Sequence, residues 1–141
     1  MWITPKTDWS GTISTDGTYI GDRFNASDFN RLKNNLEHLR EMAIELYKEF
    51  SIAPLGEDRT PADYFYADEI NTLEDNLNVI NSNTYKRKYG TSPKYVENGN
   101  TMDFNELNRL EGAMLDLYTR LNTQAINRRT FTWNFGIKGG L

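Results

Sequence analysis

The segment that governs this chain is Ser27-Asp28-Phe29-Asn30-Arg31-Leu32, because two variants of it follow later. They are Asp68-Glu69-Ile70-Asn71-Thr72-Leu73 and Asn105-Glu106-Leu107-Asn108-Arg109-Leu110. From each copy onward, apolar residues recur at spacings of three, four and three, the first set being Phe29, Leu32, Leu36 and Leu39. Residues at this spacing share one face of an α-helix. The sequence therefore predicts a mainly α protein with three amphipathic helices built from an internal repeat.

The first residue of each copy is a good helix N-cap. Ser27, Asp68 and Asn105 each carry a short side-chain oxygen that can accept hydrogen bonds from the free amides of a first helical turn. An acidic residue follows each of them, where the helix dipole favours negative charge. We therefore predict these three residues as caps, and helices over about residues 28–50, 69–81 and 106–123.

An asparagine stands three residues after each predicted cap, at Asn30, Asn71 and Asn108. In one interpretation the amide reaches back to the backbone N–H of the cap residue, as Glu or Gln does in a capping box. In the other, each asparagine holds a neighbouring loop or copy, because it projects roughly opposite the apolar stripe. The first interpretation is favoured, since one local role accounts for all three copies.

Extended arms are predicted on both sides of the repeat region 28–123, within a single domain covering 1–141. Residues 1–27 contain an alternating pattern around Asp16-Gly17 that predicts a short β-hairpin. Residues 124–141 contain alternating aromatic and polar residues over 130–137, which predicts a strand. The two arms either fold back over the helices or bind other proteins.

The aromatic residues of the arms are the candidate partner-binding residues, because large aromatic side chains dominate protein interfaces. They are Trp2, Trp9, Phe131, Trp133 and Phe135. Hydrophobic residues make up 38% of the 141 residues, which predicts a thin core and favours burial of these side chains between chains. We therefore expect an assembly.

No motif for catalysis or cofactor binding stands out. His38 is the one histidine, and the chain has no cysteine, which excludes disulfides and cysteine-ligated zinc. A P-loop, a GxGxxG motif and an HExxH motif do not occur. We therefore expect no enzyme and no catalytic, cofactor-binding or metal-binding residue, and we expect His38 at the surface or at the core edge.

Charge and hydropathy limit the partners. The net charge of −4 gives no overall attraction for nucleic acid or anionic lipid, and no apolar run is long enough to span a membrane. The one basic cluster with flanking aromatics is Tyr85-Lys86-Arg87-Lys88-Tyr89, a composition used for phosphate contact and base stacking. Three cations release few counterions, so a solvated loop or a contact with an acidic neighbour is favoured there.

The stretch Pro5-Lys6-Thr7-Asp8-Trp9, followed by Asp22-Arg23-Phe24-Asn25-Ala26-Ser27-Asp28-Phe29-Asn30-Arg31-Leu32, resembles small proteins of tailed bacteriophages and prophages of Gram-positive bacteria. Those proteins are regarded as virion or tail-region components. The resemblance covers about the first 35 residues and recurs weakly over 68–77 and 105–110, which lack the Asp-Trp pair.

The resemblance implies a non-enzymatic structural protein of the tail or baseplate region, made in the cytoplasm of the host bacterium. Its expected partners are other virion proteins or copies of itself, with no membrane and no small-molecule substrate. Two alternatives stay open. One is an adaptor that binds the host surface or a glycan through an exposed aromatic groove, and the other is a nucleic-acid-associated protein that uses residues 86–88.

Overall fold

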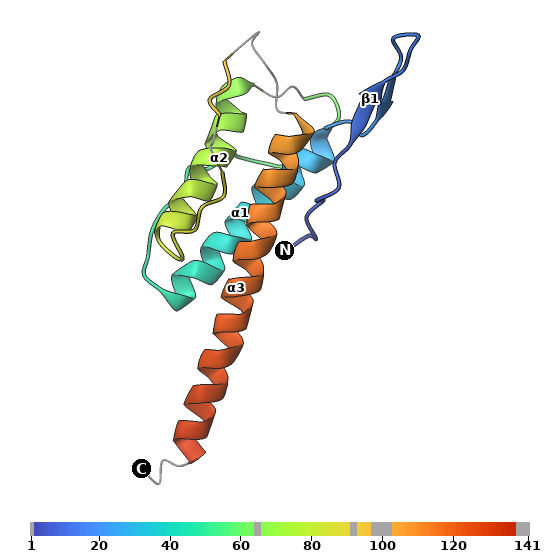
Figure 1. The fold of residues 1–141 in the computed structure, drawn as a ribbon. Coiled ribbons are helices and arrows are strands. Elements are labelled where there is room, and N and C mark those ends of the chain that lie inside the picture. The colour runs from blue at the N-terminus through green and yellow to red at the C-terminus, as the bar shows by residue number, and fades with distance from the viewer. Residues whose placement is uncertain (1, 64–65, 91–92, 97–102, 138–141) are drawn as a thin grey trace.

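The computed structural model describes residues 2–63, 66–90, 93–96 and 103–137, with side chains in the last range as far as Arg128. These residues form β1 (Gly11–Ile13), β2 (Tyr19–Gly21), α1 (Ala26–Leu46), α2 (Ala67–Ser82) and α3 (Phe104–Ile137). Figure 1 shows the helices packed side by side, with the hairpin of β1 and β2 standing away from them. The predicted fold class, mainly helical with a short hairpin, is confirmed.

The helices run parallel, so their first residues lie at one end of the molecule (Figure 1). Arg31 near the start of α1 contacts Glu111 near the start of α3, while Arg128 contacts Leu46 at the end of α1. Because each helix begins at the same end, the described residues 47–63 and 83–90 run back along the bundle, as their contacts with Arg40, Lys33 and Asn30 of α1 and with Gln124 and Asp116 of α3 show. We term residues 2–10, 47–63, 83–90 and 93–96 the return segments.

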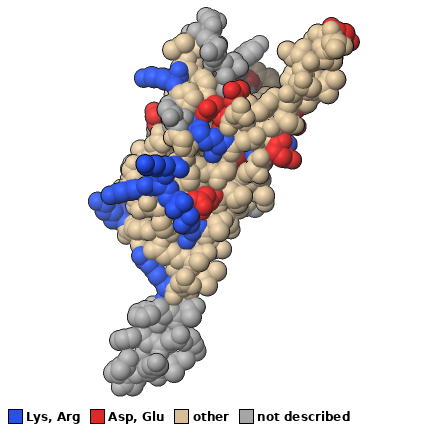
Figure 2. All heavy atoms as spheres, in the orientation of Figure 1, with Lys and Arg blue, Asp and Glu red and all other residues tan. Residues whose placement is uncertain are grey.

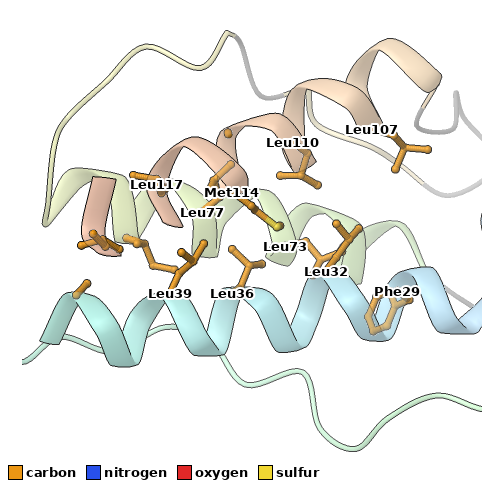
Figure 3. Packing of buried hydrophobic residues seen from close by; sticks show 14 of the residues in the cluster. Phe29, Leu32, Leu36, Leu39, Leu73, Leu77, Leu107, Leu110, Met114 and Leu117 are labelled. Carbon is orange, nitrogen blue, oxygen red and sulfur yellow. The ribbon is translucent and has the colours of Figure 1, made fainter. Parts of the chain in front are cut away.

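The predicted apolar stripes form the core between the helices (Figure 3). The stripe of α1 is buried throughout, and Leu73 and Leu77 of α2 meet it together with residues of α3. The largest fully buried side chains of the core are those of Phe29, Leu32, Leu36, Leu39, Leu73, Leu77, Ile80, Leu107, Leu110, Met114, Leu117 and Leu121. Burial of these side chains is the main stabilising contribution to a small domain.

Each helix begins two residues earlier than predicted, at Ala26, Ala67 and Phe104. Asn25 is the N-cap of α1, because its Oδ1 accepts from the backbone N–H groups of Ser27 and Asp28 at 3.0 and 3.3 Å. The carboxylate of Asp28 accepts in return from the Asn25 N–H at 3.0 Å, which completes a capping box. Ser27 is therefore the second residue of the helix, and its prediction as a cap is wrong.

The same correction applies to α2 and α3. Asp68 is the second residue of α2, whose N-cap is Tyr66, and Asn105 is the second residue of α3. Asp103 Oδ1 accepts from the Glu106 N–H at 2.8 Å, as a capping side chain does. The acidic residue of each copy thus occupies the third helical position, and the identical shift in all three copies preserves the register of the repeat.

The far ends of two helices differ from the prediction. The helix α1 ends at Leu46 instead of residue 50, because the chain turns back and Arg40 Nε donates to the carbonyl of Phe50 at 2.8 Å. The helix α3 continues to Ile137, so the strand predicted over 130–137 is wrong. No glycine or proline lies between Gly112 and Gly136, and nothing else interrupts the helix there.

The predicted hairpin is confirmed, with Thr12 opposite Ile20 in an antiparallel pair. Its turn is closed by the Ser14 N–H, which donates to the Thr18 carbonyl at 2.8 Å, and Gly17 takes a left-handed conformation with φ of +85°. Glycine adopts that conformation without the steric penalty of a Cβ. Ile13 and Ile20 remain exposed on this projecting element.

Candidate functional site

The three repeat asparagines hold the return segments against the helices. Asn30 Oδ1 accepts from the Arg59 N–H at 2.6 Å, and its Nδ2 donates to the Arg59 carbonyl at 2.9 Å. Asn71 makes the same pair of bonds with Tyr95, both at 2.8 Å. Asn108 makes it with Trp9, at 2.8 and 3.0 Å. We term these contacts the asparagine clamps.

The clamps decide between the two interpretations of the repeat asparagines. The favoured interpretation, in which each asparagine reaches back to the cap residue, is wrong. The backbone N–H groups of the observed caps Asn25 and Tyr66 donate instead to the carboxylates of Asp28 and Glu69. The interpretation in which each asparagine holds a neighbouring loop is confirmed. An amide offers one acceptor and two donors, so it can satisfy both polar groups of a single peptide backbone residue.

The clamps form a closed cycle around the bundle. Asn30 on α1 holds the segment that leads into α2, and Asn71 on α2 holds the segment that leads into α3. Asn108 on α3 holds the segment that leads into α1. Each return segment is therefore fixed to the preceding helix, with α3 serving as the preceding helix for the N-terminal segment.

Buried charged residues make a second set of contacts that join the helices to one another. Glu111 is fully buried and accepts from Arg31 at 2.7 and 2.9 Å and from Trp9 Nε1 at 2.5 Å. At the equivalent position of α2, Glu74 is buried and pairs with Arg109. Buried carboxylates need such partners, because an unpaired buried charge is strongly destabilising.

The second copy lacks the arginine of such an ion pair, because Thr72 stands where the other copies have Arg31 and Arg109. In α1 the position equivalent to Glu74 and Glu111 is the buried Lys33, which donates to the Gly56 carbonyl at 2.9 Å and pairs with Asp58 at 2.8 Å. These buried charged residues were not predicted from the sequence. The signal that could have indicated them is a charged residue directly after the last apolar residue of each copy.

The N-terminal tryptophans pack on their own chain. Trp9 is only 4% exposed and belongs to the core, so its prediction as a partner-binding residue is wrong. Trp2 is half-buried and stacks on Tyr118, with ring centroids 4.1 Å apart, and His38 lies beside both rings at the core edge. The side chains of Phe131, Trp133 and Phe135 lie outside the described residues, although their backbone belongs to α3.

The basic cluster after α2 is fixed along α3 by its two flanking tyrosines. The Tyr85 hydroxyl donates to Gln124 Oε1 at 2.5 Å, and the Tyr89 hydroxyl donates to Asp116 Oδ2 at 2.7 Å. The three cations between these tyrosines are exposed. The loop therefore presents its positive charge to solvent beside the middle of α3, where Figure 2 shows Lys and Arg side chains gathered.

An open groove of about 720 Å³ lies along α3 next to this loop. It is lined by Tyr85, Asp116, Thr119, Arg120, Thr123, Gln124, Asn127 and Arg128, and we term it the basic groove. Asp116 is its one carboxylate, and it is contacted by Arg120 at 2.9 Å and by Arg87 at 3.3 Å. The groove and the loop beside it together carry five cations against that one carboxylate.

The ionisation of the groove residues keeps this charge in place near neutral pH. Burial alone would raise the pKa of Asp116, but hydrogen bonds from Tyr89 and Arg120 outweigh it and lower the pKa. Burial is the main reason why the pKa of Tyr85 rises to about 12, and burial with the bond to Asp116 raises the pKa of Tyr89. Both hydroxyls therefore stay protonated donors.

The described residues contain no group of three or more His, Cys, Asp or Glu side chains placed to hold a metal ion. In the same part of the chain, none of the helices has the length and apolar character needed to cross a membrane. Comparison of the sequence with protein-family models and with curated proteins, and of the structure with solved structures, finds no match.

Proposed function

We propose that this chain is a non-enzymatic structural protein of a bacteriophage virion, in the tail or baseplate region, and that it acts by packing against other proteins. The observation that carries this proposal is the length of α3. Among the described side chains, the last core residue of α3 is Leu121, yet the helix continues to Ile137, about 24 Å further at about 1.5 Å per residue. In Figure 1 this part runs beyond the ends of α1 and α2.

A helical extension of this length needs a partner. Isolated helices shorter than about 12–15 residues are marginal in water, and most helical stability in proteins comes from packing of an apolar face. We term the three packed helices with their return segments the body of the molecule. Among the described side chains, the last contact of α3 with the body is made by Arg128, which donates to the Leu46 carbonyl at 2.5 Å. The segment beyond it contains three large aromatic residues, the type that anchors protein interfaces.

The body suits a role as a rigid base for such a contact. The asparagine clamps and the buried ion pairs fix the return segments, so the elements that project are the hairpin and the end of α3 (Figure 1). The virion setting is supported by the resemblance of residues 5–9 and 22–32 to small phage proteins. No constellation of described residues favours an enzyme over this role.

Truncation tests the proposal. A chain lacking residues 130–141 keeps the contacts of Gln124 and Arg128, so it should keep a cooperative melt and the helical circular dichroism of the body. In a phage that carries the truncated gene, mass spectrometry of purified virions should no longer detect the chain. The control is the full-length chain with Ile13→Thr on the exposed hairpin, which should still be incorporated.

Three results would contradict the proposal. One is incorporation of the truncated chain at the level of the full-length chain. Another is unfolding of the truncated chain, which would assign residues 130–141 to the core of the chain itself. A full-length chain absent from purified virions would refute the virion setting.

A further inference from the structure

We propose that the basic groove binds a second copy of this chain, through the carboxylates of Glu37, Glu41 and Glu45 on α1. This inference deepens the proposed function and rests on it, because it names one partner in the assembly. It is carried by two matching rows of side chains on two different helices.

The first row consists of hydrogen-bond donors on α3. Arg120, Gln124 and Arg128 all line the basic groove and follow one another at every fourth residue, so they share one face of the helix. Gln124 Oε1 accepts from the hydroxyls of Tyr85 and Tyr47 at 2.5 and 3.0 Å. This fixes the side chain, and no described group accepts from its Nε2, which can donate to an incoming carboxylate.

The second row consists of acceptors on α1. Glu37, Glu41 and Glu45 are exposed and also follow one another at every fourth residue. No described Lys or Arg lies within ion-pair distance of any of the three; the neighbouring Arg40 pairs with Glu49 at 3.0 Å instead. Like charges at this spacing destabilise a helix, and cations from outside the chain remove that repulsion.

The two rows have the same length and opposite character. Each spans eight residues, about 12 Å along its helix at about 1.5 Å per residue. Two helices packed at the usual separation of about 8–10 Å can therefore pair the rows step by step, with arginines against the outer glutamates and Gln124 against Glu41. Bonds from guanidinium to carboxylate are among the stronger hydrogen bonds in proteins.

The charge distribution favours a second copy over nucleic acid as the occupant. The whole chain has a net charge of −4, so the basic groove is a local exception that the rest of the surface would repel from a polyanion. Five cations release few counterions, which gives weak binding to DNA at physiological salt. A copy of the chain brings three unpaired carboxylates at the spacing of the donors.

The contact joins different surfaces of the two copies. Each copy has both a groove on α3 and a row on α1, so it can bind one neighbour with the first and another neighbour with the second. Such heterologous contacts produce a ring when the rotation between copies closes and a filament when it does not.

Sedimentation velocity of the full-length chain tests the inference. We expect concentration-dependent association that weakens as NaCl is raised from about 0.05 M to about 0.5 M, because salt screens exposed ion pairs. Replacing the acceptor row with Glu37→Lys, Glu41→Lys and Glu45→Lys should weaken association by on the order of tenfold or more. Reversing the donors with Arg120→Glu and Arg128→Glu should do the same.

Mixing the two charge-reversed chains is the decisive measurement. The lysine row of one chain then faces the glutamates in the groove of the other, and the unaltered groove and the unaltered row also match. A mixed complex should therefore form at concentrations at which neither chain associates alone. The control is Glu57→Lys with Asp75→Lys, which changes exposed carboxylates outside the row and should leave association unchanged. Circular dichroism checks the fold of each variant. If the Arg120 and Arg128 variant does not fold, Lys86→Glu with Lys88→Glu replaces it.

Three outcomes would overturn the inference: a monomer at every concentration in low salt, association unaffected by both charge reversals, or salt-sensitive binding of a short DNA duplex by the groove without self-association. The last outcome would assign the groove to nucleic acid. The chain lacking residues 130–141 keeps both rows and should still self-associate. Failure of this inference is therefore separable from failure of the proposed function, which concerns that C-terminal segment.

Discussion

The asparagine side chain ends in an amide of the same chemical kind as the peptide unit, and six described asparagines use that likeness. Three form the clamps, and Asn35, Asn76 and Asn81 bond in the same way to Ile3, Ala53 and Arg87. At each clamp a buried or half-buried backbone residue would otherwise lie outside a helix or strand with its N–H and carbonyl unpaired. Unpaired buried backbone groups are costly, so the clamps allow long segments without secondary structure to lie against the bundle. An aspartate could accept from the N–H but would repel the carbonyl.

Replacing Asn108 by alanine should lower the free energy of unfolding by about 1–3 kcal/mol, because the N–H and carbonyl of the nearly buried Trp9 lose both partners. Urea denaturation measures the change. The matched control is Asn122→Ala, an exposed asparagine on the same helix, for which a change within about 0.5 kcal/mol is expected. Equal losses for the two variants would contradict a special role for the clamp.

At the level of helices and strands, the apolar spacing was enough to predict three helices, and the Asp16-Gly17 pair was enough to predict the hairpin. The helix starts were misplaced because Asn25 and Asp103 are as suitable for capping as the residues chosen. The strand over 130–137 was wrong because alternation of aromatic and polar residues over a short stretch does not exclude a helix. A local sequence pattern therefore predicts the type of an element more reliably than the residues at which the element begins and ends.

The hairpin turn should respond to acid. The Asp16 carboxylate accepts from the Ser14 hydroxyl and from the Thr18 N–H, and these bonds lower its pKa from 3.8 to about 2. A folded pKa below the unfolded one means that the contribution to the turn is present above the unfolded value and is lost as pH falls towards 2. An NMR titration of the Asp16 carboxyl should show a midpoint near 2.

The control for this titration is Ser14→Ala, which removes the first of the two bonds and should move the midpoint up towards the ordinary value. Thr18 still donates its N–H in that variant, so a smaller shift should persist. A midpoint near 3.8 in the unaltered chain would show that these bonds do not hold the turn in solution.

For the molecule as a whole, the sequence did not reveal that the helices are parallel or that each asparagine holds a segment many residues away. Asn108 and Trp9 are 99 residues apart, and neither spacing nor composition connects them. The basic cluster was visible in the sequence, but its position beside Arg120 and Arg128 depends on how residues 83–90 run back along α3. Such features arise from the arrangement of elements and not from any one of them.

Because the clamps close a cycle, the body should unfold in one step. In the chain lacking residues 130–141, Trp2 and Trp9 are the only tryptophans, so fluorescence reports the N-terminal segment while far-ultraviolet circular dichroism reports the helices. The two melting curves should coincide, as they do in two-state unfolding. A fluorescence change at a lower temperature would show that the N-terminal segment detaches before the helices melt.

The parallel arrangement also gives the molecule an electrical polarity. In an antiparallel bundle neighbouring helix dipoles oppose one another, whereas here all of them point the same way and add. Asp28, Glu69 and Glu106 offset the positive end in the first turns, while the last turns of α1 and α2 hold no basic residue. The positive end is therefore offset by side chains of the helices themselves, whereas at the negative end of α1 the compensating cation comes from another helix, since Arg128 of α3 donates to the Leu46 carbonyl.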